Sequence, residues 1–98
     1  MAEETIRLDR FLWFARLVKT RTLAQELAAK GRLRLNGRVV ERAAAPVRVG
    51  NILTFALRGQ VRVLRIEALP VRRGPAPEAR ACYRDLETDN VSQEGATD

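Results

Sequence analysis

The chain has 98 residues, which is enough for one domain with a modest core but leaves no room for a second, catalytic domain. It carries 18 basic and 12 acidic residues, a formal net charge of +6, and its sequence pI is near 11.0. The charge is segregated, because residues 5–84 hold a formal +13 whereas residues 85–98 hold −5 and no basic residue. Clustered Arg and Lys of this kind indicate a polyanionic partner such as a nucleic acid.

Several absences exclude other classes of protein. The chain has no His, and Cys82 is its only cysteine, so the commonest general base, an intrachain disulfide and a thiolate metal site are all missing. No phosphate-cradling GxxxxGK or dinucleotide-binding GxGxxG occurs, and the carboxylates are scattered. We therefore expect no catalysis by this chain alone, no metal and no cofactor. Cys82 is expected to be a small, partly buried side chain.

Nothing in the sequence predicts a membrane segment. The longest apolar run of interest, residues 11–15, is far shorter than the ~20 residues of a membrane span. The N-terminal residues MAEET are acidic where a secretory signal would be basic and then apolar. The expected location is the cytoplasm.

The first expected helix begins at Thr5 or Arg7 and closes at residues 18–19. Its apolar residues recur at i, i+3, i+4 and i+7 and predict one core-facing side, formed by Leu8, Phe11, Leu12 and Ala15. Asp9 lies in the first turn, where stabilising the helix start is favoured over a direct role in binding. Trp13 and Phe14 lie near Arg10 on the far side. A later segment is expected to cover them, and a stacking surface for bases is the alternative.

A second, short helix follows. Thr20 is the expected N-cap, and a capping box of Thr22 and Gln25 is the alternative if the helix starts slightly later. The stripe Leu23, Ala24, Leu27 and Ala28 predicts its buried side, and Gly31 is expected to end it.

A β-hairpin is predicted next, since Asn36-Gly37 separates two short runs with strand character. The alternation in residues 32–35 predicts that Leu33 and Leu35 face the core. It also predicts that the three arginines of the hairpin share one solvent face: Arg32, Arg34 and Arg38.

The remaining segments predict a small sheet and a loosely ordered end. Strands are expected over 52–57 and 60–69, with Pro70 after the second. Residues 70–86 are expected to form a basic loop and a short helix beginning near residue 76, whereas residues 1–4 and 87–98 are expected to be disordered. The expected fold class is α+β, with two helices packed on a small, mainly antiparallel β-sheet.

Residues 7–54 resemble the S-four-type RNA-binding domain, the αL module named after small-ribosomal-subunit protein four. The resemblance rests on three motifs in order: RLD opening the first helix, KTR opening the second, and GRLRLNG in the hairpin, followed by VRVGNILTF. A stand-alone chain that begins in this way is similar to the bacterial ribosome-associated fifteen-kilodalton heat-shock protein family, whose members carry a longer, basic C-terminal extension. We assign residues 5–69 to the S-four-type domain.

The resemblance implies binding to ribosomal RNA on free large subunits that still carry a stalled nascent chain, and a part in recycling them after heat stress. It also implies that the two helices and the hairpin tip face the RNA. It selects Arg7, Arg10, Arg16, Lys19, Thr20, Arg21, Arg32, Asn36 and Arg38 as RNA-binding residues, and the charge pattern adds Lys30 and Arg34. Residues 7–38 together hold nine basic and two acidic residues, a formal +7.

Three alternatives to a stand-alone RNA-binding protein stay open on the sequence alone. The first is a general nucleic-acid-binding protein, and some DNA affinity is expected in any case because phosphate contacts do not discriminate. The second is an RNA-targeting module that acts with an RNA-modifying enzyme, and the third is a protein-interaction module whose binding would survive high salt. The expected partner is structured RNA of the large ribosomal subunit. The protein is expected to bind it as a monomer and to have no membrane partner.

Overall fold

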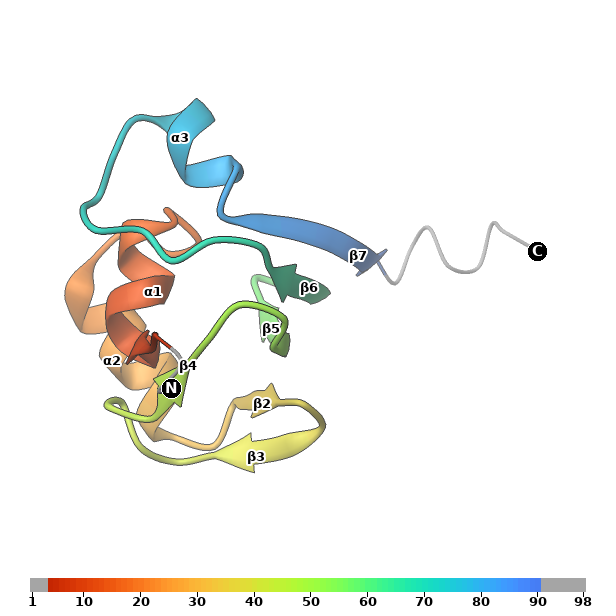
Figure 1. The fold of residues 1–98 in the computed structure, drawn as a ribbon. Coiled ribbons are helices and arrows are strands. Elements are labelled where there is room, and N and C mark those ends of the chain that lie inside the picture. Colours follow the sequence, from red (N-terminus) through yellow and green to blue (C-terminus); the bar gives the residue numbers. More distant parts are fainter. Residues whose placement is uncertain (1–3, 91–98) are drawn as a thin grey trace.

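The computed structural model describes residues 4–90 and has the expected α+β class, with helices on one side of an antiparallel sheet (Figure 1). The elements run in the order β1 (Ile6–Arg7), α1 (Leu8–Phe14), α2 (Arg21–Ala29), β2 (Leu33–Leu35), β3 (Arg38–Val40), β4 (Pro46–Val47), β5 (Ile52–Leu57), β6 (Gln60–Ile66), α3 (Ala76–Arg80) and β7 (Tyr83–Asn90). None of the helices within residues 4–90 is long and apolar enough to cross a membrane.

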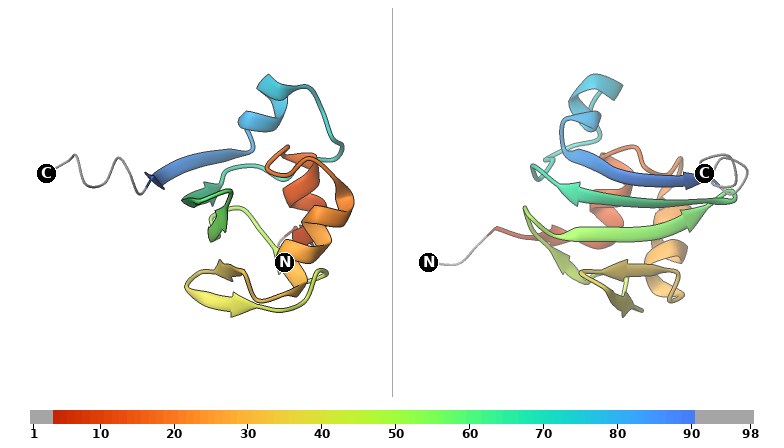
Figure 2. Two further views of the ribbon diagram at one scale, coloured as in Figure 1. Left: turned by 180° about the vertical axis from the view of Figure 1, so that it is seen from behind. Right: turned by 90° about the vertical axis from the view of Figure 1, so that its right-hand side faces the viewer.

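The main sheet has five strands in the order β3-β2-β5-β6-β7, and every neighbouring pair is antiparallel. The predicted strand 52–57 forms as expected, whereas the next strand ends at Ile66 rather than at residue 69. Helices α1 and α2 lie against one face of this sheet, as the two views of Figure 2 show. A second, two-stranded sheet joins β1 to β4 beside the start of α1.

The core fills the space between the helix pair and the covered face of the sheet. Burying large aliphatic and aromatic side chains here is the main driving force for folding, at about 25 cal/mol per Å² of apolar surface. The largest fully buried side chains come from α1, the hairpin, the β1–β4 pair and the central strands: Leu8, Phe11, Leu12, Leu33, Val47, Leu53, Leu64 and Ile66. On α2, Ala24, Leu27 and Ala28 are buried as well, whereas Leu23 is only partly buried. The predicted core side is therefore confirmed for α1 and, apart from Leu23, for α2.

Helix α1 is shorter than predicted and ends at Phe14 rather than near residue 19. The reason is a left-handed residue, Arg16, with φ of 59°. Its N–H donates to the Trp13 carbonyl at 3.1 Å, and the N–H of Leu17 donates to the Leu12 carbonyl at 3.0 Å. These two bonds form a Schellman ending, which usually has Gly at the left-handed position. The turn that follows buries Leu17 and Val18 in the core.

The segment after α3 differs from the expected helix over 76–86. Helix α3 ends at Arg80, and residues 83–90 form β7 on the edge of β6, in register from Ile66 opposite Tyr83. Without β7, the backbone groups along that edge of β6 would lack strand partners. Residues 87–90 are therefore strand and not disordered as predicted, and the rest of the predicted acidic tail, 91–98, lies outside the described residues.

We predict that Leu33→Ala lowers the free energy of unfolding by about 2–5 kcal/mol, because a fully buried side chain loses its packing and leaves a cavity. Val39→Ala, in the partner strand of the same hairpin but 52% exposed, should change it by less than about 0.5 kcal/mol. Urea unfolding of both variants measures the difference. Equal effects would contradict the assignment of faces in the hairpin.

Candidate nucleic-acid interface

A groove of about 210 Å³ runs over the solvent side of the two helices. Its lining comes from the end of β1 and from α1 and α2: Arg7, Asp9, Arg10, Trp13, Phe14, Arg21 and Gln25. Three of these seven side chains are guanidinium groups and one is a carboxylate, so the groove is net positive. The sequence placed the three arginines on a common surface, and the structure brings them together.

Arg10 and Arg21 are exposed and have no carboxylate partner within the described residues. The guanidinium carbon of Arg21 lies 4.7 Å from the centroid of the Trp13 ring, so a cation–π contact holds it in place. Guanidinium groups with free N–H donors on a preformed surface suit phosphate oxygens, which they bind in a bidentate manner.

Arg7 differs from the other two because it is paired. Its Nε and Nη2 donate to the carboxylate oxygens of Asp9 at 3.0 and 2.9 Å, and the backbone N–H of Arg10 donates to Asp9 at 2.8 Å. The hydrogen bond to Asp9 raises the pKa of Arg7, and the charge of Asp9 adds to the effect. Asp9 itself is buried, so it stabilises the helix start as the sequence indicated and fixes the direction of Arg7.

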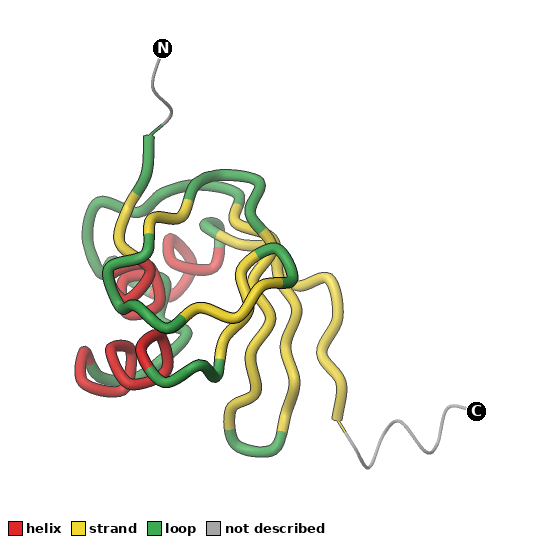
Figure 3. The backbone as a smooth tube through the Cα atoms, turned by 90° about the horizontal axis from the view of Figure 1, so that it is seen from below, coloured by secondary structure: helices red, strands yellow, loops and turns green. Residues whose placement is uncertain are grey.

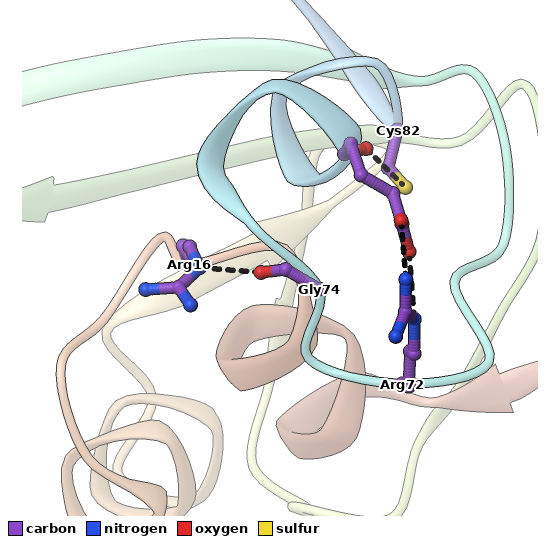
Figure 4. A network of polar contacts seen from close by, with 5 residues as sticks. Arg16, Arg72, Gly74 and Cys82 are labelled. Carbon is purple, nitrogen blue, oxygen red and sulfur yellow. Dashed lines mark hydrogen bonds and ion pairs between the residues drawn. The ribbon is translucent and has the colours of Figure 1, made fainter.

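The loop after the sheet reaches Trp13, as expected, but Trp13 and Phe14 remain half-buried in the groove lining rather than fully covered. Arg73 donates from Nε to the Trp13 carbonyl at 3.0 Å, and its guanidinium carbon lies 5.2 Å from the Trp13 ring centroid. Arg16 donates from Nε to the carbonyl of Gly74 at 2.6 Å, which Figure 4 shows as a link from the end of α1 to this loop. Arg73 is not among the residues predicted from the sequence, although an Arg pair directly before Gly74-Pro75 is a visible basic signal.

The other predicted residues near the helices lie around α2. The hydroxyl of Thr20 accepts a hydrogen bond from the N–H of Leu23 at 3.0 Å, so Thr20 is the N-cap and the alternative start at Thr22 is wrong. Lys19 is exposed in the connection before it. Lys30 is exposed at the opposite end of α2, next to Gly31, and does not line the groove.

The hairpin residues do not line the groove either, and one of them is on a different face than predicted. Arg38 pairs with Leu35 across the turn, and directly opposed residues in an antiparallel pair point to the same side. Arg38 therefore shares the face of the core leucines at the sheet margin, whereas Arg34 pairs with Val39 on the opposite face. Arg32 alternates with Leu33 and belongs to the face of Arg34. The expected common surface of three hairpin arginines is wrong for Arg38.

Asn36 at the hairpin turn is committed to the fold. Its φ is 51°, and its side-chain oxygen accepts from the N–H of Ile52 at 2.8 Å, while its own N–H donates to the Ile52 carbonyl at 2.8 Å. These two bonds fasten the turn to the start of β5. Within the side chain, the amide NH₂ is the group left for a ligand.

The groups that could carry other chemistry are structural. Cys82, predicted to be partly buried, is more deeply buried, at 6% exposed, and its thiol donates to the Glu78 carbonyl at 3.6 Å. Burial, with a smaller contribution from Glu78, raises the pKa of this thiol, which disfavours the reactive thiolate. In the part of the chain that the structure describes, no cluster of three or more His, Cys, Asp or Glu side chains could hold a metal ion.

The sequence and the fold are those of a known class of protein. A family model for the S4 domain matches residues 6–53, which spans both helices, the hairpin and the first part of β5. The chain is thus an S4-domain protein, in agreement with the motifs of its first half.

Comparison with related proteins narrows the family to which this chain belongs. The chain is 33% identical over 94 residues to a heat shock protein 15 homolog of Haemophilus influenzae, covering 96% of this chain and 71% of the relative. It is 33% identical over 87 residues to an RQC P-site tRNA stabilizing factor of Listeria innocua, covering 87% of this chain and 94% of the relative. A trimeric structure of heat shock protein 15 from Vibrio cholerae superimposes with a TM-score of 0.79 at 34% identity, covering 85% of this chain and 83% of that one. The chain belongs to this heat shock protein 15 family.

We predict that Asn36→Gly lowers the free energy of unfolding by about 0.5–1.5 kcal/mol, because the side-chain bond to Ile52 is lost while Gly keeps the positive φ. Asn36→Ala should cost about 1–2 kcal/mol more, since Ala also pays for the left-handed backbone. Thermal or urea unfolding of the two variants separates the two terms. Equal stability of Gly and Ala variants would argue against backbone strain at this turn.

The loop that reaches Trp13 should respond to acid. Arg72 donates two hydrogen bonds to Glu78, at 3.1 and 2.8 Å, and these bonds lower the pKa of Glu78 below its ordinary value. The stabilisation is then complete above the pKa that Glu78 has in the unfolded chain, and it is lost as the pH falls through the lower pKa of the folded state. NMR titration of the Glu78 carboxyl should give a higher pKa in Arg72→Ala. An unshifted titration would show that the pair does not persist in solution.

Proposed function

We propose that this protein binds RNA through the groove on α1 and α2, without catalysing a reaction on it. The observation that supports this most directly is that Arg10 and Arg21 line one groove beside Trp13 with no carboxylate partner in the described residues. A preformed set of free guanidinium donors supplies favourable phosphate contacts without a large ordering cost. Trp13 and Phe14, both half-buried in the groove lining, add a face on which a base can pack.

Structured RNA suits this surface better than duplex DNA. A DNA-reading helix needs several side chains that can reach base edges in the major groove, whereas α2 has only nine residues and exposes Arg21, Thr22, Gln25 and Glu26. Recognition of RNA relies more on shape and on backbone contacts, which a short basic helix pair can provide.

The proposed target is ribosomal RNA of the large subunit in ribosomes that carry a stalled nascent chain. The support comes from relatives, since one is named a heat shock protein 15 homolog and another an RQC P-site tRNA stabilizing factor. The P site lies on the ribosome, so both the ribosomal RNA and the tRNA held there are polyanions that this groove could contact. Ribosome association would also place the protein in the cytoplasm, and we propose that it binds as a monomer.

We predict that Arg10→Ala combined with Arg21→Ala weakens binding to a structured ribosomal RNA fragment by roughly 100-fold, at about 1.4 kcal/mol for each lost charged contact. The slope of log K against log salt should become less negative by about 1.4–1.8, or 0.7–0.9 for each contact. The control removes two charges elsewhere: Arg58→Gly at the β5–β6 turn, which projects away from the helices (Figure 3), and Arg80→Gln on α3. Gly suits the φ of 55° at position 58.

Fluorescence anisotropy over a salt series, with structured RNA, single-stranded RNA and duplex DNA, measures these affinities. The control variant should bind like the wild-type protein. Equal affinity for all three nucleic acids at moderate salt would favour a general nucleic-acid-binding protein. Binding that resists high salt would contradict a phosphate interface and favour a protein partner.

A further inference from the structure

The S4 match ends at residue 53, yet the loop between β6 and α3 reaches back to the end of α1. Two reciprocal bonds make this connection: Arg73 donates to the Trp13 carbonyl, and Arg16 donates to the Gly74 carbonyl. In each case the donor is Nε, and the Nη groups of both arginines make no hydrogen bond to another residue within 4–90. The Trp13 carbonyl lies at the C-terminus of α1, where a cation is favoured, and this suits the guanidinium group of Arg73.

Arg73 lies against the Trp13 ring, which Arg21 of the groove also contacts. Its guanidinium carbon is 5.2 Å from the Trp13 centroid, and that of Arg21 is 4.7 Å from it. Neither has a carboxylate partner within residues 4–90. Two unpaired cations held on one indole repel each other, and an anion that bridges or approaches both relieves the repulsion.

We propose that Arg73 is an RNA-binding residue, contributed by a segment outside the S4 domain, and that its Nη groups contact a backbone phosphate of the RNA lying in the groove. This proposal rests on the proposed function and extends it. Arg73 is not part of the groove lining, so this contact extends the binding surface beyond the groove, past Trp13, the ring that both Arg21 and Arg73 contact. The segment after the sheet is thereby part of the binding surface and more than a connection to β7.

The neighbouring Arg72 provides a matched control. Arg72 donates to Glu78 of α3, whereas Arg73 donates to the Trp13 carbonyl of α1. Figure 4 shows Arg72 on the α3 side of the loop and Arg16 approaching the loop from the α1 side. Arg72 and Arg73 are adjacent in the sequence, and replacing either one by Ala removes one positive charge. A difference between the two variants therefore reports the position of the charge and not the net charge.

The test compares wild-type protein with Arg73→Ala, Arg73→Lys and Arg72→Ala in anisotropy titrations with one structured ribosomal RNA fragment at several salt concentrations. We expect Arg73→Ala to weaken binding about tenfold and to make the salt slope less negative by about 0.7–0.9, the value for one phosphate. Arg73→Lys should keep the wild-type salt slope, since it keeps the charge, and Arg72→Ala should match the wild-type protein in both affinity and slope.

Trp13 fluorescence keeps a structural effect apart from a phosphate contact. Trp13 is the only tryptophan, so its emission reports whether each variant keeps its local structure and whether RNA reaches the site. If Arg73→Ala and Arg72→Ala bind alike, or if Arg73→Lys loses as much affinity as Arg73→Ala with an unchanged slope, Arg73 does not contact phosphate. If instead the wild-type protein binds no RNA, the proposed function fails, and that result is distinct from a failure at Arg73.

Discussion

Packing of α1 against the sheet is the constraint on which the remaining structure depends. The helix has seven residues and presents Leu8, Phe11 and Leu12 to the core with no exposed surface. A helix this short is not stable alone, so its burial fixes both its position and its rotation. Once that side is buried, Arg10 and Trp13 must face the solvent beside α2. The placement of the binding groove therefore follows from the apolar half of the helix.

At the end of α1, the backbone conformation of Arg16 is unfavourable for its residue type, yet its side chain makes a long-range contact. Arg16 occupies a left-handed position where Gly costs least, and a non-Gly residue there is disfavoured by roughly 1 kcal/mol. The side chain compensates by donating to Gly74, which ties the helix end to a segment far away in the sequence. A residue that departs from its preferred backbone while making a long-range contact is a reasonable sign of function, because strain persists only where the surrounding structure holds it.

The sequence was sufficient where local signals act over a few residues. Helical spacing found the core side of α1, the Thr20 cap and Gly31 bounded α2, and Asn36-Gly37 gave the hairpin. It was insufficient where a partner far along the chain decides. The face of Arg38 depends on pairing across the turn, β7 forms because β6 offers an open edge, and Arg73 reaches Trp13 only through the fold.

The distribution of carboxylates defines the groove as much as the number of arginines does. Among the described residues, ion pairs engage arginines at the sheet and at the α3 loop: Arg62 with Asp85, Arg65 with Glu67, and Arg72 with Glu78. On the helix pair the corresponding contact is that of Asp9 with Arg7. Asp9 belongs to the groove lining but is only 6% exposed, and its carboxylate is already engaged by Arg7. Within residues 4–90, Arg10, Arg21 and Arg73 around Trp13 have no carboxylate partner. A polyanion that approaches Trp13 therefore meets unpaired positive charge beside aromatic surface.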